Sequence, residues 1–239
     1  MVGSLAATFS LEPIAQDQTY HAFADRRALF GVSNFFDVAS NIPFILVGIA
    51  GLRFCARSPV GPFRAAWITL FAGVALVSVG SAYYHWAPDD RTLVWDRLPM
   101  TIGFMGLFAA ILGESLGEKI GKRLLLPLIL VGLSSVLVWR WFDDLRFYVW
   151  VQFIPLLVIP IVLLLFRKQQ SQPVFLAAAL GFYLLAKVLE FYDREIFAAT
   201  GGLVSGHSLK HVSASMACLA LLLMLKGRER MKHLSSRRP

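Results

Sequence analysis

Charged residues are scarce in this 239-residue chain: they make up 16% of it, whereas 57% is hydrophobic. Soluble globular domains contain about a quarter charged residues, so this composition excludes an ordinary soluble protein. The mean hydropathy of +0.63 indicates a chain whose solvent is lipid. At this length we expect one membrane domain, with no room for a second globular unit.

Cysteine is also scarce, and two common signatures are missing. Cys55 and Cys218 both lie in apolar stretches, so they indicate inert core residues rather than a disulfide framework. Residues 1–30 contain no basic region followed by an apolar core, and we therefore expect no cleavable signal peptide. The soluble metalloprotease motif His-Glu-x-x-His is absent, because Ser208 stands where its glutamate would be.

The net charge of +8 does not indicate nucleic-acid binding. Basic residues gather in short turns and in a tail that runs from Lys226 to Arg238, as they do in membrane proteins. We therefore predict the membrane and no nucleic acid as a partner, with the tail near anionic lipid headgroups.

Apolar stretches of about 20 residues predict seven membrane-spanning helices. Their ranges are 37–55, 64–86, 98–116, 122–140, 146–166, 173–193 and 206–226. We expect an all-α bundle in residues 37–226, after an extramembrane segment 1–36 and before a basic cytoplasmic tail 227–239. The short polar interruption at Asp143-Asp144, between the fourth and fifth apolar stretches, predicts a tight helical hairpin.

The distribution of Lys and Arg predicts the orientation of the bundle. Connections 1–2, 3–4 and 5–6 together with the tail hold 14 of these residues. The N-terminal segment and connections 2–3, 4–5 and 6–7 hold 7, and Lys187 and Lys210 lie within spans and are not counted. The cytoplasmic loops of membrane proteins are enriched in Lys and Arg, so we predict a cytoplasmic C-terminus and an N-terminus outside.

Three of the five histidines lie in or at the mouth of these spans. His207 and His211 are four residues apart on one helical face, and the topology brings His85 to the same, non-cytoplasmic depth. Ionisable groups in hydrocarbon usually face the bundle interior and serve a function. Three imidazoles suit a Zn²⁺ ion with an open coordination position, although interhelical hydrogen bonding is an alternative.

Asp96 and Ser81 are the predicted catalytic residues near this cluster. Asp96 is placed to act as general base on the attacking water, and Ser81 to donate to the developing oxyanion. Both have simpler alternatives. Asp96 would cap the third span, with Pro99 in its first turn, and Ser81 would bond to its own helix.

Other polar residues in the spans have structural interpretations. Lys187 and Glu190 are three apart and are expected to pair with each other or across helices, with a supporting role for Glu190 at the metal as an alternative. Lys210 lies on a different face from its flanking histidines and is expected to extend outward to the interface. His21 and His233 lie outside the spans and are expected to be solvated.

The pattern Ser81-x-x-x-His85, Asp96 and His207-x-x-x-His211 across seven spans resembles the alkaline ceramidase family. The flanking segments, such as Trp95-Asp-Arg-Leu-Pro-Met, are similar to its bacterial branch. The family belongs to a wider superfamily that includes the adiponectin receptors. The resemblance covers the chain from about Ser33 to the last span.

The resemblance implies zinc held by the three histidines, with Ser81 and Asp96 beside the attacking water. Ser40-Asn41 resembles the Ser-Asn of the family's first helix. Eukaryotic members also bind calcium through acidic residues ahead of that helix. Residues 20–25 and Asn34 offer few carboxylates here, and no calcium site is predicted.

Together these features predict a zinc-dependent membrane hydrolase that cleaves the amide bond of a ceramide-like lipid drawn from the bilayer. We expect it in a bacterial inner (cell) membrane. One alternative is a hydrolase of another lipid amide or ester on the same scaffold. The other is a seven-helix receptor or sensor in which zinc is structural.

Overall fold

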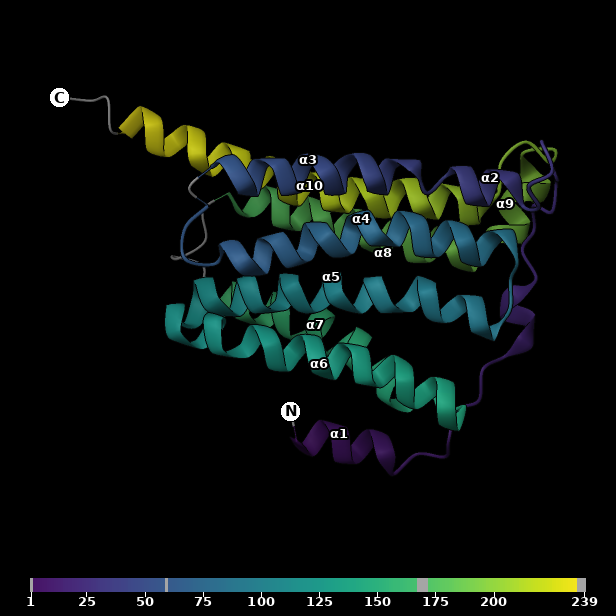
Figure 1. Ribbon diagram of the computed structural model, residues 1–239, viewed down its shortest axis with the longest axis horizontal. Helices are drawn as coiled ribbons and strands as arrows, with labels where there is room; N and C mark the ends of the chain where they lie inside the picture. The colour runs from purple at the N-terminus through teal and green to yellow at the C-terminus, as the bar shows by residue number, and fades with distance from the viewer. Residues whose placement is uncertain (1, 59, 167–171, 236–239) are drawn as a thin grey trace.

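A computed structural model describes residues 2–58, 60–166 and 172–235, and every regular element in these ranges is a helix (Figure 1). The helices are α1 (Val2–Phe9), η1 (Gln18–His21), α2 (Phe35–Ala39), α3 (Ile42–Arg57), α4 (Arg64–Trp86), α5 (Asp90–Leu116), α6 (Glu118–Phe142), α7 (Arg146–Leu165), α8 (Pro173–Phe191), α9 (Asp193–Ala199) and α10 (Gly206–Ser235).

Seven helical stretches of the described chain are long and apolar enough to cross a membrane. They are Phe35–Arg57, Arg64–Trp86, Asp90–Leu116, Glu118–Phe142, Arg146–Leu165, Pro173–Phe191 and Gly206–Met231. The all-α, seven-span prediction is therefore confirmed, and the chain is an integral multi-pass membrane protein. The division at residues 36 and 227 stays a prediction; α10 continues unbroken across the second boundary, and residues 236–239 lie outside the described residues.

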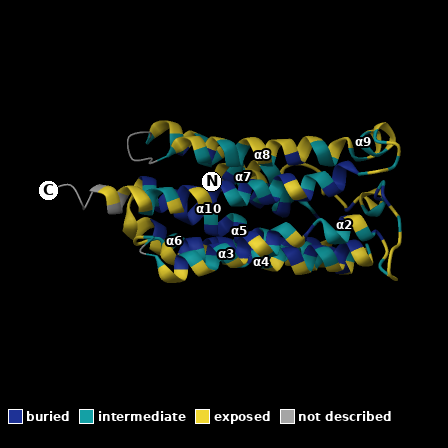
Figure 2. Ribbon diagram, turned by 90° about the horizontal axis from the view of Figure 1, so that it is seen from above, coloured by how far each residue is buried: buried dark blue, intermediate teal, exposed yellow. Residues whose placement is uncertain are grey.

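The helices differ strongly in how deeply they are packed. α3, α4, α5 and α6 pack in chain order, and α10 packs on both α3 and α8. α7 packs on α5, α6 and α1. In the most apolar part of each helix, 67% of the residues of α5 are buried but only 11% of those of α8 (Figure 2). α5 is therefore the central helix, and α8 is attached to the bundle mainly through α10.

Glycines allow α4 and α5 to approach closely. A Cβ atom added at Gly80 would overlap the carbonyl oxygen of Trp95, and one added at Gly73 would overlap the backbone of Gly103. Small residues are enriched where membrane helices meet at short distance. The Gly80 contact brings Ser81 on α4 to the level of Asp96 on α5.

The start of α5 corrects the predicted boundary of the third span. α5 begins at Asp90, eight residues before the expected position 98. Asp89 is its N-cap: its carboxylate accepts from the backbone of Arg91 and Thr92, and Thr92 completes a capping box. Asp96 thus lies about two turns inside the helix, so its interpretation as a cap, with Pro99 in the first turn, is wrong.

The predicted hairpin between α6 and α7 is confirmed. Asp143 ends α6 in the left-handed conformation, and α7 begins three residues later. Arg146 donates to the carboxylate of Asp144 at 2.7–3.0 Å, and these hydrogen bonds lower the pKa of that carboxyl group.

The segment between α1 and α2 covers the end of the bundle at which α4 ends and α10 begins (Figure 1). The His21 ring bonds to the hydroxyl of Tyr84 at 2.9 Å and to Asp90 at 3.0 Å, so its expected solvation is wrong. The side chain of His233 lies outside the described residues. Burial raises the pKa of Asp25, but hydrogen bonds from Arg27 outweigh it and the net pKa is lowered. The segment is therefore anchored by polar contacts.

Candidate metal centre and cavity

The three histidines singled out in the sequence meet at this covered end. His85 lies in the last turn of α4, and His207 and His211 lie in the first two turns of α10. All three are buried. Nε2 of His85 lies 3.2 Å from Nε2 of His211 and 3.3 Å from Nε2 of His207. Their ligand atoms all lie within 4.8 Å of one another.

This spacing fits three ligands of one ion. Zinc–imidazole bonds of 2.0–2.1 Å in a tetrahedral site place neighbouring nitrogens roughly 3.3 Å apart. No fourth His, Cys, Asp or Glu of the described chain joins the group. The cluster can therefore hold a metal ion through three imidazoles, and a fourth coordination position is left open.

A serine on the first span orients one of these rings. The Ser40 oxygen lies 2.7 Å from Nδ1 of His211 and donates its own proton to the Asp37 carbonyl at 2.8 Å. The hydroxyl is thus free to accept from Nδ1–H, which leaves the Nε2 lone pair for a metal. Before the structure, only the family resemblance pointed to Ser40.

Two carboxylates that we did not single out in the sequence hold the start of α10. Oδ1 of Asp37 accepts from the hydroxyls of Ser205 and Ser208, at 3.1 and 2.7 Å. Oδ1 of Asp193 accepts from the backbone N–H of His207 at 2.7 Å, and its Oδ2 accepts from Ala24 N–H at 3.0 Å. These bonds fix the register of the turn that carries His207.

An aromatic ring covers the cluster on the side of the N-terminal segment. The ring of Phe23 lies 4.6 Å from that of His85 and 4.7 Å from that of His207, measured between centroids. Asn34 donates to the backbone carbonyl of His85 at 2.8 Å. The segment ahead of α2 therefore shields the imidazoles from solvent on that side.

Ser81 and Asp96 lie on the cavity side of the cluster. Both line one cavity together with His211, and the Ser81 hydroxyl hydrogen-bonds to the Asp96 carboxylate. Ser81 is buried, and Asp96 is half-buried. The structure thus brings the five residues predicted from the sequence to one end of the bundle.

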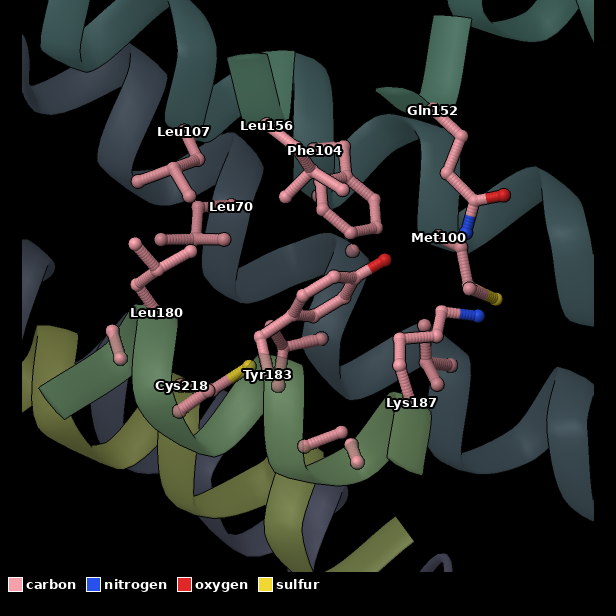
Figure 3. Close-up of a pocket in the computed structure, with 18 of the residues that line it drawn as sticks. Leu70, Met100, Phe104, Leu107, Gln152, Leu156, Leu180, Tyr183, Lys187 and Cys218 are labelled. Carbon is pink, nitrogen blue, oxygen red and sulfur yellow. The ribbon is translucent and has the colours of Figure 1, made fainter. Parts of the chain in front are cut away.

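The cavity is large and amphipathic, with a volume of about 920 Å³. Its walls come from α3, α4, α5, α7, α8 and α10. Figure 3 shows Leu70, Leu107 and Leu180 toward one end, with Gln152 and Lys187 at the other. A ligand with a polar group and a long apolar chain matches this division.

Three charged residues form a chain of ion pairs on the cavity wall. Lys187 pairs with Glu190 at 2.7 Å, as the sequence predicted. Lys210 also pairs with Glu190, at 2.8 Å, and lines the cavity. Its expected outward extension is therefore wrong, because the half-buried carboxylate of Glu190 on α8 offers it a partner.

Comparison with known proteins identifies the family of this chain. The model of the family described as Ceramidase matches residues 29–236, which is most of the chain. The chain belongs to the ceramidase family. A search of curated proteins finds no match. Membership of this family implies a hydrolase with a lipid substrate, in agreement with the buried cluster and the amphipathic cavity.

Proposed function

We propose that this ceramidase-family member is a zinc-dependent membrane hydrolase that cleaves the amide bond of a ceramide-like lipid. The observation that carries the proposal is the convergence of three buried Nε2 atoms beside a large, mostly apolar cavity that His211 lines. His85, His207 and His211 would hold the ion, and zinc, when bound, supplies Lewis acidity and lowers the pKa of a water ligand to about 7.

The side chains around the cluster fit the remaining chemistry. Hydrolysis of an amide adds water across the C–N bond and gives a carboxylic acid and an amine. The Asp96 carboxylate takes a proton from the attacking water and delivers it to the leaving nitrogen. Once Asp96 holds that proton it no longer needs the hydrogen bond from Ser81, and the Ser81 hydroxyl donates instead to the carbonyl oxygen as that oxygen gains charge. The acyl chain then lies along the leucines of the cavity.

The open position separates this proposal from a structural role for zinc. Structural zinc sites are almost always closed by four protein ligands, whereas catalytic sites keep one position for water or substrate. The cluster in the described chain has three protein ligands and a cavity beside it. This favours an enzyme over a receptor with structural zinc.

The test is hydrolysis of N-acylsphingosine by the purified protein, with metal content measured on the same sample. We expect about one zinc per chain, release of fatty acid, loss of activity when a chelator removes the metal, and recovery when zinc is returned. Activity that persists in metal-free protein would contradict the zinc mechanism. Cleavage of lipid esters alone would favour the ester alternative.

Histidine variants assign the ligands. The double variant His207→Ala/His211→Ala should lose zinc and activity together, because one remaining imidazole cannot hold the ion. His21→Ala is the matched control, since His21 bonds to Tyr84 and Asp90 and is not part of the cluster. Full zinc occupancy in the double variant would overturn this ligand assignment.

A further inference from the structure

Arg97 is a buried cation on the wall of the same cavity. Arg97 is only 5% exposed. It directly follows Asp96 on α5, and both residues line the cavity. Nη2 donates to the side-chain oxygen of Gln16 at 2.7 Å. Nη1 is buried and has no hydrogen-bond partner among the described residues.

Aromatic rings hold the guanidinium in place. Its central carbon lies 4.1 Å from the ring centroid of Trp139 and 4.6 Å from that of Tyr148. These cation–π contacts fix the plane of the group and use none of its N–H donors, and those of Nη1 have no acceptor among the described residues. A purely structural arginine would have these donors satisfied, because an unpaired buried donor is costly.

The neighbouring carboxylates are engaged elsewhere. Glu190 is shared by Lys187 and Lys210, and Asp96 accepts from Ser81. No ion pair within the described residues includes Arg97. The polar end of the cavity therefore contains three cationic groups and two carboxylates, and the guanidinium is the cation without an anionic partner.

We propose that Arg97 binds an anionic group on the amine portion of the substrate. The inference rests on the proposed amidase function and adds a preference to it: among lipid amides, those with a carboxylate or sulfonate a few bonds from the nitrogen are cleaved faster than neutral ones. Guanidinium groups recognise such planar or multidentate oxyanions through paired N–H donors. Arg97 would hold this group beside Asp96, which protonates the same nitrogen as it leaves.

Three lipids with one acyl chain test the proposal. N-palmitoylglycine and N-palmitoyltaurine carry a carboxylate and a sulfonate, whereas N-palmitoylethanolamine has a neutral hydroxyl at similar length. The wild-type protein should have a higher kcat/KM for at least one anionic lipid than for the neutral one. The anionic lipid with the higher kcat/KM identifies the anionic group that Arg97 binds. A preference for the neutral lipid would overturn the inference, even if no Arg97 variant folds.

Arg97→Gln should lower kcat/KM for the preferred anionic lipid roughly 10- to 100-fold more than for the neutral lipid, as expected for a lost charged hydrogen bond. Arg97→Lys, which keeps the charge, should retain part of the preference. Arg91→Gln is the matched control, because it removes an exposed cation from the same helix. Equal losses on all three lipids would show that Arg97 acts only in structure.

Binding distinguishes failure of this inference from failure of the proposed function. Purified wild-type protein should be stabilised against heat more by the preferred anionic lipid than by N-palmitoylethanolamine, and Arg97→Gln should abolish the difference. Such selectivity without hydrolysis would support the anion site and contradict the amidase. Hydrolysis without selectivity would support the amidase and overturn the anion site.

Discussion

Ser40 illustrates how one side chain prepares the cluster for a metal. Its hydroxyl bridges Nδ1 of His211 and the Asp37 carbonyl, so the ring is held with Nε2 toward the other two imidazoles. Hydrogen bonds to the second nitrogen of a ligating histidine orient the ring and increase its basicity. Ser40 therefore belongs to the proposed site although it does not contact the ion.

We predict that Ser40→Ala weakens zinc affinity by about 10- to 100-fold, the usual effect of removing such a partner. Competition with a calibrated chelator measures the change. Ser134→Ala is a control, because among the described residues the Ser134 hydroxyl bonds to the carbonyl of Val131 in its own helix. Unchanged affinity in Ser40→Ala would show that the orientation of His211 is set by packing alone.

Asp96→Asn should retain zinc and fold but lower kcat by roughly 10²–10⁴, the contribution of a positioned acid–base group. Ser81→Ala should lose less, about 10²-fold, because it removes one donor to the oxyanion. Asp89→Asn is the control: Asp89 caps α5, and Asn caps about as well as Asp. An unchanged kcat in Asp96→Asn would remove Asp96 from the mechanism.

The residues of the site could be predicted only in part. The three histidines stood out because imidazoles are rare in apolar spans, and Asp96 because a carboxylate follows the turn after His85. Asp193 gave no such signal: it bonds to the backbone of Ala24 and His207, and hydrogen bonds between distant segments have no sequence pattern. Its importance is visible only in the folded chain.

Helix boundaries show the same limit at the scale of elements. The third span was expected at 98 because Asp96 and Arg97 reduce the apolar character of the preceding stretch. In the structure both side chains line the internal cavity, so α5 extends through them to its cap at Asp89. Hydropathy cannot distinguish a charge that faces lipid from one that faces a polar cavity.

The contact between α4 and α5 positions both halves of the proposed site, and we predict that it is intolerant of a methyl group. Gly80→Ala would place Cβ against the Trp95 carbonyl oxygen and force the helices apart. Overpacking of this kind costs about 1–3 kcal/mol. Thermal unfolding should show a lower Tm, and activity should fall because Ser81 and Asp96 separate.

Gly181→Ala is the matched control for this contact. Gly181 is exposed on α8, and a Cβ atom there meets nothing within 4 Å. Alanine favours a helix by about 1 kcal/mol over glycine, so this variant should be neutral or slightly more stable. A Gly80→Ala protein as stable and active as Gly181→Ala would refute the close-contact argument.

For the molecule as a whole, the structure separates the proposed site from the C-terminal end of α10. The cluster lies at the end of the bundle that contains α2 and α9, whereas α10 ends, at Ser235, at the opposite end (Figure 1). A site and a C-terminus at opposite ends of a spanning bundle lie toward opposite faces of the membrane. Determining the side of one terminus therefore determines the side of the metal centre.

We predict a cytoplasmic C-terminus and a metal centre in the outer half of the membrane. The basis is the excess of 14 over 7 Lys and Arg residues on the C-terminal side, which positive-inside placement assigns to the cytoplasm. A fluorescent reporter fused after Pro239 should be active, and a phosphatase that works only outside should be inactive there. The same phosphatase fused before Met1 should be active. The reverse pattern would place the site, and the lipid leaflet that supplies its substrate, on the cytoplasmic side.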